Sequence, residues 1–453
     1  MEGNGLDIKK MLAMLAQSKA QVKPLENVTI KIIDLPYITK ERKVSKRKLR
    51  LYTPNDAIKP MPLIFVPHYE MPEDALEMRE YLKEGWAVAS CAEFNGGEYN
   101  KTITDDDLVF NNAMLYYLRN LDEIDSERIA VVGGSAGGYM TLMLNALQSG
   151  ICCAVANGPI TNFYFNFKYY FPKANAYNLK AIMAMTEEER KDVVTMLSKL
   201  PIPFVGAIGG GAGFTAALEN FPDENEVERW EAFSPTAICE AFGNPIYITS
   251  CTSDILVPVD QITRRFTYKE NGESLPKGFD CTLPDNLFGK LKYSLEERLP
   301  SDQVNVFLRK VMTDGSDTVY EFDDTKRFQI FITDEGAPES YCSHNKGINT
   351  GKAIDVPYIK AMFDKKASKT NVITVEKVIM LVKRYNGESI QLPAIEGVDD
   401  TVYGSFAIYK KEVLQHFKKW KNDSANELDF ALENVRETNL DLVKTIDEII
   451  ENI

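Results

Sequence analysis

The fold is decided by the stretch Ile129-Ala130-Val131-Val132-Gly133-Gly134-Ser135-Ala136-Gly137-Gly138-Tyr139-Met140. Four apolar residues run into a G-x-S-x-G motif, and residues with helical spacing follow it. In this strand–turn–helix context the turn is so sharp that small neighbours are required, and the serine hydroxyl stands exposed above the sheet. The amides that open the helix can stabilise negative charge that develops beside it. Ser135 is therefore the predicted nucleophile. The alternative is an ordinary glycine-rich βα turn or a phosphate loop, and the sequence lacks the G-x-x-x-x-G-K-[ST] pattern of the latter.

Short apolar runs recur on both sides of this turn, separated by segments with helical spacing such as Asp107–Leu118 and Ala136–Leu147. The later runs barely alternate between polar and apolar residues, which is typical of central parallel strands covered on both faces. The pattern predicts a mostly parallel, eight-stranded α/β sheet with helices on both faces, whose first two strands form an antiparallel pair. The predicted strands are Asn27–Ile33, Lys46–Tyr52, Pro62–Val66, Trp86–Ala92, Arg128–Val132, Ile151–Ala156, Pro245–Ser250 and Arg327–Thr333.

The composition narrows the classes of function. The 453 residues carry 52 basic and 66 acidic side chains, a net charge of −14, whereas binding to nucleic acid or to an anionic membrane needs a basic surface. No apolar run approaches the ~18 residues of a membrane span, and the run Met11–Ala16 is too short for a signal peptide. We therefore expect a cytoplasmic protein without nucleic-acid or membrane partners. Only three histidines are present, which excludes a histidine-rich metal site, and we expect no cofactor and no metal.

A serine nucleophile is weak unless a base takes its proton and an acid orients that base. When a serine stands on such a turn, the acid and then the histidine follow it in the chain, each after a later strand. Asp254 lies in the loop after the predicted strand Pro245–Ser250 and is the predicted acid. Asp260 is the runner-up, and a simple helix-capping role for Asp254 is the alternative.

The base follows by elimination from the three histidines. His344 comes after both Asp254 and the predicted strand that ends at Thr333, which is the expected position. His416 lies among apolar and lysine residues with helical spacing, where a packed or surface histidine is expected. His68 precedes the serine in the chain. His344 is therefore the predicted general base.

The oxyanion that forms on attack needs two donors, and the backbone amide of Ala136 supplies the first. The strand that ends at Val66 leads into Pro67-His68-Tyr69-Glu70, the position from which this kind of fold contributes its second donor. The predicted donor is either a backbone N–H of the turn at His68 and Tyr69 or the Tyr69 hydroxyl. A purely structural role for both side chains is the alternative.

Two segments do not follow the regular alternation of strands and helices, at about residues 163–232 and 264–324. The first is rich in aromatic residues, the second is polar, and both are predicted to be lid insertions in a catalytic domain that spans residues 1–350. Residues 351–453 are predicted to form a mainly helical C-terminal extension. Its last segment, Ala425–Ile453, carries an apolar stripe that either docks on its own domain or joins a homo-oligomer.

These motifs resemble the prolyl oligopeptidase-like serine hydrolases of the α/β-hydrolase superfamily. The resemblance rests on Ile124–Ala130 leading into Gly134–Gly138 and on Ala232–Pro235 followed by Asp254 and Val257-Pro258. The turn Pro67-His68-Tyr69 is similar to the oxyanion tyrosine turn of the cocaine esterase and X-Pro dipeptidyl peptidase relatives. The resemblance spans about residues 60–350 and implies a Ser-Asp-His triad. The residues before the strand at 61–66 are expected to be too few for the N-terminal β-propeller of prolyl oligopeptidases. Residues 350–453 are expected to be helical, where the esterase relatives carry a jelly roll.

The sequence therefore predicts a serine hydrolase that cleaves an ester or amide of a small to medium, partly aromatic molecule or short peptide through an acyl-enzyme. One alternative is an exo- or oligopeptidase, in which Glu70 and Glu93 are the acidic residues available to hold a free amine. The others are an acyltransferase and a binding protein that has kept the fold without catalysis.

Overall fold

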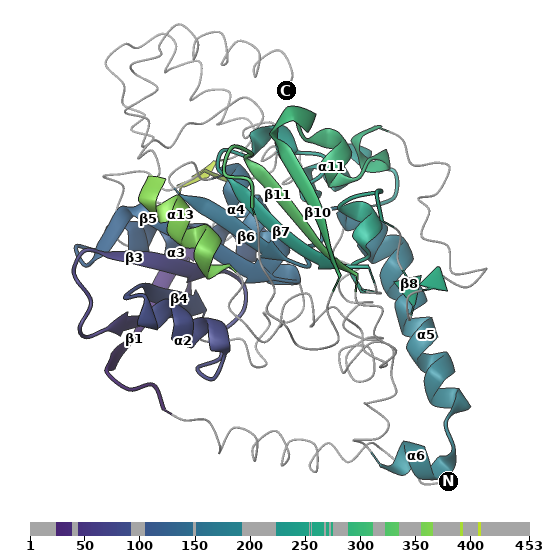
Figure 1. The fold of residues 1–453 in the computed structure, drawn as a ribbon, viewed down its shortest axis with the longest axis horizontal. Coiled ribbons are helices and arrows are strands. Elements are labelled where there is room, and N and C mark those ends of the chain that lie inside the picture. The colour runs from purple at the N-terminus through teal and green to yellow at the C-terminus, as the bar shows by residue number, and fades with distance from the viewer. Residues whose placement is uncertain are drawn as a thin grey trace, which may run out of the picture.

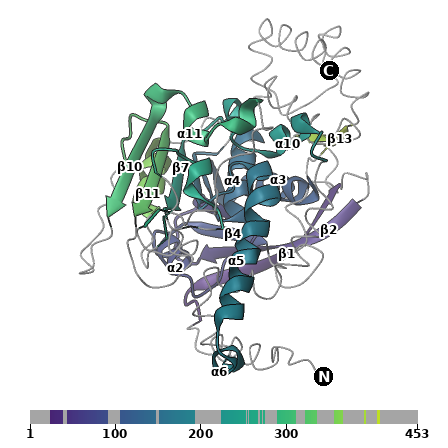
Figure 2. The same ribbon diagram turned by 90° about the vertical axis from the view of Figure 1, so that its right-hand side faces the viewer.

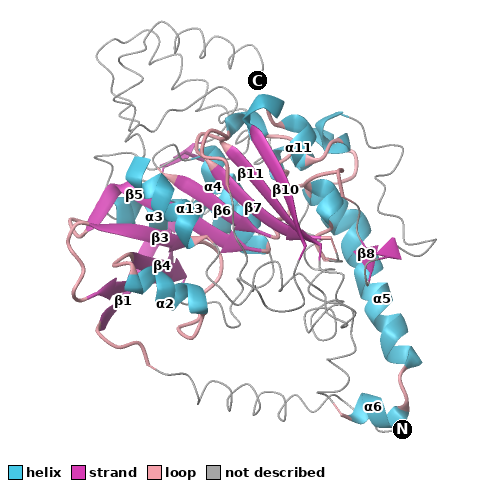
Figure 3. Cartoon of the chain, viewed as in Figure 1, coloured by secondary structure: helices cyan, strands magenta, loops and turns pink. Residues whose placement is uncertain are grey.

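The computed structural model describes residues 24–38, 44–91, 105–147, 151–192, 223–252, 254, 256–266, 269–270, 273–274, 289–310, 322–334, 355–365, 390–392 and 406–408. Helices lie around a central sheet, and one long helix, α5 (Phe171–Ala184), extends away from it with α6 (Glu187–Lys191) at its far end (Figures 1 and 3). A second view shows the same arrangement (Figure 2).

The described part of the chain contains a nine-stranded sheet in the order β1-β2-β4-β3-β5-β6-β7-β11-β10. Strand β2 runs antiparallel to both of its neighbours, and all the other pairs are parallel. The predicted α/β-hydrolase fold and the antiparallel first pair are confirmed. The strands are β1 (Val28–Ile38), β2 (Val44–Pro54), β3 (Met61–Val66), β4 (Ala87–Cys91), β5 (Ile124–Gly134), β6 (Cys153–Asn157), β7 (Ile246–Cys251), β10 (Val304–Lys310) and β11 (Phe328–Asp334).

The ninth strand, β10, lies inside the segment 264–324 that the sequence pattern assigned to an insertion. It pairs in parallel with β11 at the edge of the sheet, with Val304 opposite Phe328. Its first residues are only partly buried, so the strand lacks the continuous apolar run that marks its buried neighbours. The insertion as predicted is therefore too wide, because its last part belongs to the sheet.

Alternate residues of the strands face two different layers. On one face, residues such as Phe65 and Val131 pack with α3 (Asp105–Arg119) and α4 (Ala136–Leu147). On the other, residues such as Ile64 and Val132 pack with α2 (Leu76–Lys83) and α13 (Val356–Lys365), which lie in front of the sheet in Figure 1. Two covered faces explain why the central strands read as unbroken apolar runs.

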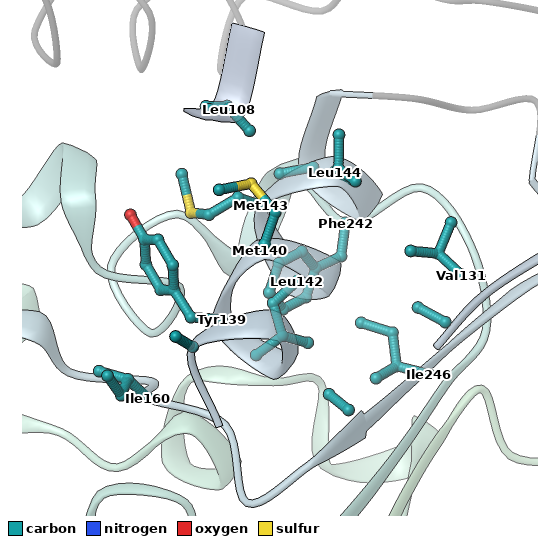
Figure 4. Close-up of a cluster of buried hydrophobic side chains, with 14 of the residues drawn as sticks. Leu108, Val131, Tyr139, Met140, Leu142, Met143, Leu144, Ile160, Phe242 and Ile246 are labelled. Carbon is teal, nitrogen blue, oxygen red and sulfur yellow. The ribbon is translucent and has the colours of Figure 1, made fainter. Parts of the chain in front are cut away.

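Helix α4, which begins directly after Ser135, is the most deeply buried of these helices. The side chains of Tyr139, Met140, Leu142, Met143 and Leu144 are all fully buried, although they point in different directions around the helix. Figure 4 shows them together with residues of the sheet and of the segment before β7. A helix that is apolar on all sides belongs in a core. Its first turn therefore has a rigid support.

The segment after β6 contains a π-helix, η2 (Phe165–Tyr170), that continues into α5, and α10 (Val227–Phe233) follows further on. Its aromatic side chains pack on one another. The rings of Phe163 and Phe167 stack at 4.4 Å, and those of Tyr164 and Trp230 meet edge to face at 5.1 Å. All four are buried, so they form a core for this segment, and their presence is no evidence for an aromatic substrate.

The remaining described elements are short. They are η3 (Cys239–Ala241), η4 (Val259–Gln261), β8 (Lys269–Glu270), β9 (Glu273–Ser274), η5 (Gly289–Lys292), α11 (Leu295–Arg298), η6 (Ser301–Gln303), β12 (Ile390–Leu392) and β13 (Phe406–Ile408). The last two pair with each other, so the described part of the C-terminal extension holds one helix and a small antiparallel pair. Residues His416 and 425–453, with the apolar stripe, lie outside the described residues. Among the helices that are described, none combines the length and the apolar character needed to cross a membrane.

A buried carboxylate lies under α13 on the second face of the sheet. Asp355, directly before the helix, accepts a hydrogen bond from the Tyr81 hydroxyl of α2, and both side chains are almost fully buried. Burial raises the pKa of Asp355 to about 6. The folded protein therefore holds this proton more tightly than the unfolded chain does.

We expect this proton to make stability depend on pH. The contribution of Asp355 is complete below its ordinary pKa and is lost as the pH rises towards about 6. Between pH 4 and pH 7 the wild type should lose about 2 kcal/mol of unfolding free energy that Asp355→Asn does not lose, at 1.36 kcal/mol for each pKa unit. Urea unfolding of both proteins at the two pH values measures this difference. The prediction is contradicted if the wild type and Asp355→Asn differ in unfolding free energy by the same amount at both pH values.

Candidate active site

The backbone at Ser135 has a strained conformation that fits the predicted role. Its φ is +57°, in the left-handed region that non-glycine residues rarely enter, and it lies between the end of β5 and the start of α4. The turn is tied to the neighbouring strand, because the Ser135 N–H donates to the Asn157 carbonyl at 2.8 Å. The Asn157 side chain in turn accepts from the Thr249 hydroxyl of β7 at 2.7 Å. The sheet therefore fixes the position of the serine.

The two outer glycines of the motif both lie in tight contacts, and the contact at Gly133 leaves no room for a side chain. A Cβ at Gly133 would lie 2.3 Å from the carbonyl oxygen of Gly137, which no side chain can tolerate. A Cβ at Gly137 would lie 3.1 Å from the Pro67 carbonyl oxygen and 3.2 Å from the Tyr69 ring. The motif therefore makes a tight turn possible and also lets the turn after β3 approach the serine.

Tyr69 is the residue of that turn that reaches the serine. The Ser135 side chain and the backbone amide of Ala136 both lie close enough to its hydroxyl to lower its pKa. Burial, aided by the negative charge of Asp107, raises the pKa of Tyr69 to about 12. The hydroxyl therefore keeps its proton at neutral pH and can donate it in a hydrogen bond.

The backbone amides of the same turn are already engaged. The Tyr69 N–H donates to the Pro67 carbonyl at 2.8 Å, and the His68 N–H donates to Asn111 Oδ1 at 3.0 Å. The His68 imidazole bonds through Nδ1 to the carboxylate of Asp107. Of the two donors that the sequence left open at His68 and Tyr69, the structure thus brings the hydroxyl to the serine and turns these amides elsewhere.

Asp254 lies where the sequence predicted an acid, just beyond the end of β7. Its side chain is 1% exposed, and its Oδ1 accepts hydrogen bonds from the amides of Leu256 and Val257, both at 2.9 Å. These bonds cap the following turn and also fix the plane of the carboxylate. Asp260 lies further on in η4 and is partly exposed.

The acid loop is joined to the segment after β6 by buried hydrogen bonds. Gln261 Oε1 accepts from the amides of Thr161 and Asn162 at 2.9 and 3.0 Å, and the Gln261 carbonyl accepts from the Thr161 hydroxyl at 2.8 Å. Asn166 of the π-helix donates to the Leu256 carbonyl at 2.8 Å. The loop that carries Asp254 is therefore held by the structure around it.

The topology brings these residues to one edge of the sheet. Strands β3, β5, β7 and β11 are parallel, so the residues that follow them lie at the same carboxyl edge. In the sheet, β3 lies between β4 and β5. The chain passes from β3 to β4 on one side and then crosses to β5 on the other side, and open α/β sheets bind ligands at such a switch point. Tyr69 and Ser135 lie there, and Asp254 follows a strand two places further along. His344 follows β11 in the chain but lies outside the described residues, as does Glu93.

Sequence reasoning missed several polar residues around the turn after β3. Asp107, in the first turn of α3, pairs with both His68 and Arg47. Glu70, a candidate for binding a substrate amine, pairs with Arg50 of β2, so its charge is already compensated. The i, i+4 spacing of Asp107 and Asn111 was the only signal that the two act together.

Part of the chain matches the model of a known protein family. Residues 98–194, which include the serine turn and α4, match the model of the prolyl oligopeptidase family. No curated protein matches the sequence.

Several solved hydrolases resemble the structure at low identity. An esterase of Pyrococcus furiosus is 13% identical over 81% of this chain and 96% of its own, with a TM-score of 0.40. The 2,6-dihydroxy-pseudo-oxynicotine hydrolase is 13% identical over 81% and 77%, with a TM-score of 0.42. An acylaminoacyl peptidase of Pyrococcus horikoshii is 14% identical over 80% of this chain and 45% of its own, with a TM-score of 0.38.

These superpositions are loose, so the fold assignment rests on the strand order and on the serine turn. The predicted resemblance to prolyl oligopeptidase-like α/β-hydrolases is confirmed by the family match. Together with the strained serine between β5 and α4, it identifies the chain as a serine hydrolase.

Proposed function

We propose that the protein cleaves an ester or amide bond through an acyl-enzyme, with Ser135 as nucleophile, His344 as general base and Asp254 as the acid that orients the histidine. The observation that carries this proposal is the strained Ser135, which stands between β5 and α4 with the Tyr69 ring packed beside Gly137 of the same turn. A nucleophile and two oxyanion donors are thereby assembled before any substrate binds.

In this mechanism Ser135 Oγ attacks the substrate carbonyl while His344 takes its proton. The carbonyl oxygen becomes an oxyanion that accepts hydrogen bonds from the Ala136 amide and the Tyr69 hydroxyl. His344 then returns the proton to the leaving group, and water releases the acyl group in a second round. Asp254 keeps the imidazole in the correct tautomer and stabilises its positive charge.

A second candidate activity is cleavage of short peptides. It is favoured by the match of residues 98–194 to the prolyl oligopeptidase family. The pairing of Glu70 with Arg50 argues against a free-amine site at that residue. We therefore place small esters and amides first as substrates, and an acyltransferase that uses the same acyl-enzyme remains an outcome of the test. A cytoplasmic location is part of this proposal.

A fluorophosphonate probe followed by a substrate panel tests the proposal. Labelling of the protein at Ser135 is expected, and a binding protein without catalysis would remain unlabelled. Aryl esters of short acids are then compared with dipeptide arylamides. Higher kcat/KM on the esters supports an esterase, higher kcat/KM on the arylamides supports a peptidase, and faster acyl transfer to an added alcohol than to water supports an acyltransferase.

The assignment of the acid predicts a contrast between two neighbouring aspartates. Asp254→Asn should lower kcat by about 10⁴, as loss of the orienting carboxylate does in other triads. Asp260→Asn is the matched control and should stay within about threefold of wild type, because in the proposed triad only Asp254 orients the base. Steady-state kinetics on one good ester measures both, and the reverse pattern would reassign the acid to Asp260.

The assignment of the second oxyanion donor makes Tyr69→Phe informative. This change removes one hydroxyl and keeps the ring that packs on Gly137. Because the lost hydrogen bond strengthens as charge develops, kcat should fall by about 10²–10³, or some 3–4 kcal/mol, with little change in KM. The control is Tyr293→Phe, at an exposed tyrosine. A Tyr69→Phe rate within threefold of wild type rejects the hydroxyl as donor.

A further inference from the structure

The turn that presents Tyr69 is itself strained. His68 has a φ of +70°, and the bond from the Tyr69 N–H to the Pro67 carbonyl closes a three-residue γ-turn around it. A γ-turn with positive φ is rare and unfavourable. Among the described residues only Asn27, His68 and Ser135 are non-glycine residues with positive φ, so two of the three lie at this site. Such strain persists only where the surrounding structure holds it.

Two residues of α3 hold the turn. Asn111 Oδ1 accepts the His68 N–H at 3.0 Å, and the Asp107 carboxylate accepts a hydrogen bond from His68 Nδ1. Because a carboxylate only accepts, this bond fixes the imidazole with a proton on Nδ1. The backbone and the side chain of His68 are therefore both attached to the same helix.

Asp107 is in turn braced from two directions. Asn111 Nδ2 donates to the Asp107 carbonyl at 2.7 Å and to its Oδ1 at 3.2 Å, while Arg47 Nη1 lies 3.0 Å from the same Oδ1. Asp107 and Asn111 are buried, and Arg47 is largely so. A buried carboxylate with an arginine partner and several hydrogen bonds has little freedom to move.

The position of Tyr69 depends directly on this arrangement. The Tyr69 and His68 rings meet edge to face at 4.4 Å, and the hydroxyl at the far end of Tyr69 reaches Ser135 and Ala136. A rotation of the turn at His68 would be carried along the tyrosine ring to its hydroxyl. A shift of about 1 Å in a catalytic group can lower a rate by 10².

We propose that His68 and Asp107, braced by Asn111 and Arg47, form a positioning unit that holds the strained turn and thereby aims the Tyr69 hydroxyl at the oxyanion. The proposal rests on the proposed function and adds to it the residues that set one oxyanion donor. In this role the His68 imidazole transfers no proton, and it acts only as a hydrogen-bonded positioning residue.

Two substitutions at His68 distinguish a positioning role from a role in proton transfer. Asn tolerates positive φ and carries an amide donor close to the position of the imidazole Nδ1, so His68→Asn keeps the tie to Asp107. His68→Ala loses that tie. We expect His68→Ala to lower kcat by about 10- to 100-fold with KM within about threefold, and His68→Asn to recover most of that loss. If Asn is as damaging as Ala, the imidazole takes part in proton transfer and the proposal is overturned.

A double-mutant comparison tests whether the effect passes through Tyr69. In the Tyr69→Phe background His68→Ala should lower kcat by less than about twofold, because the group that His68 positions is already absent. The same fold loss in both backgrounds, or no loss in either, overturns the proposal, as does a silent Tyr69→Phe. Fluorophosphonate labelling of Ser135 in the wild type reports separately on the proposed function, since a protein that does not label fails at that earlier level.

If His68→Ala does not fold, as judged by circular dichroism and melting temperature, Asp107→Asn replaces it in the same comparison. Asp107→Asn is expected to lower kcat about tenfold in the wild type and less than twofold in Tyr69→Phe. The matched control is Asp125→Asn, at a partly buried carboxylate that pairs with Arg128 at 2.7 Å at the opposite end of β5. It should leave kcat unchanged, and equal effects of the two substitutions overturn the proposal.

Discussion

Ser135→Ala should lower kcat by about 10⁴–10⁶, because the covalent route disappears while substrate binding and the oxyanion donors remain. The substitution should fit the turn, because it removes only the serine hydroxyl and leaves the outer glycines in place. Stopped assays on one aryl ester measure the loss. Labelling by a fluorophosphonate should vanish in the same variant.

The control for this variant is Ser301→Ala, at an exposed serine in η6 that should keep both its rate and its label. Ser135→Ala is expected to fold as the wild type does, which circular dichroism can check. Undiminished labelling of Ser135→Ala would mean that another serine is the nucleophile, and the proposed mechanism would then be wrong.

His344→Ala should lower kcat by a similar factor, because a serine without its base is a poor nucleophile and the leaving group loses its proton donor. The three histidines of the chain allow a complete comparison. His416→Ala is the matched control and should stay near the wild-type rate. The measurement is again kcat on one good ester.

The comparison with His68 decides between two bases. If His344→Ala keeps most of the activity and His68→Asn does not, then His68 is the base and the triad as proposed is wrong. The contacts of His68 argue against that outcome, because its Nδ1 is bonded to Asp107 and its main chain is attached to Asn111.

Much of the fold was predictable because the central strands are covered on both faces. An unbroken apolar run such as that of β7 has few other interpretations, and the helical spacing of 136–147 gave the bounds of α4 that the structure has. β10 was not predictable in the same way, because it is an edge strand with partly exposed residues between polar segments. Its place in the sheet depends on pairing with β11, which the local sequence does not encode.

The site was predictable where a local motif makes a tight turn. Ser135 and Asp254 follow strands whose ends the sequence marks, and Tyr69 follows the strand that supplies the second donor in this fold. Asp107 and Asn111, which hold the turn at His68, were missed because they lie far from that turn in the chain. His68 and Asp107 are separated by 39 positions, and only the packing of α3 beside the turn after β3 brings them together.

The glycines beside Ser135 have a consequence for how related sequences should be interpreted. Gly133 is required by its contact with the main chain of Gly137, and Gly137 lies close to the turn after β3, whether or not the serine reacts. A descendant that has lost its nucleophile still needs Gly133, and a larger residue at Gly137 would have to displace the turn after β3. Across an evolving lineage, their persistence therefore records the survival of the architecture, and only the residue between them records the survival of catalysis.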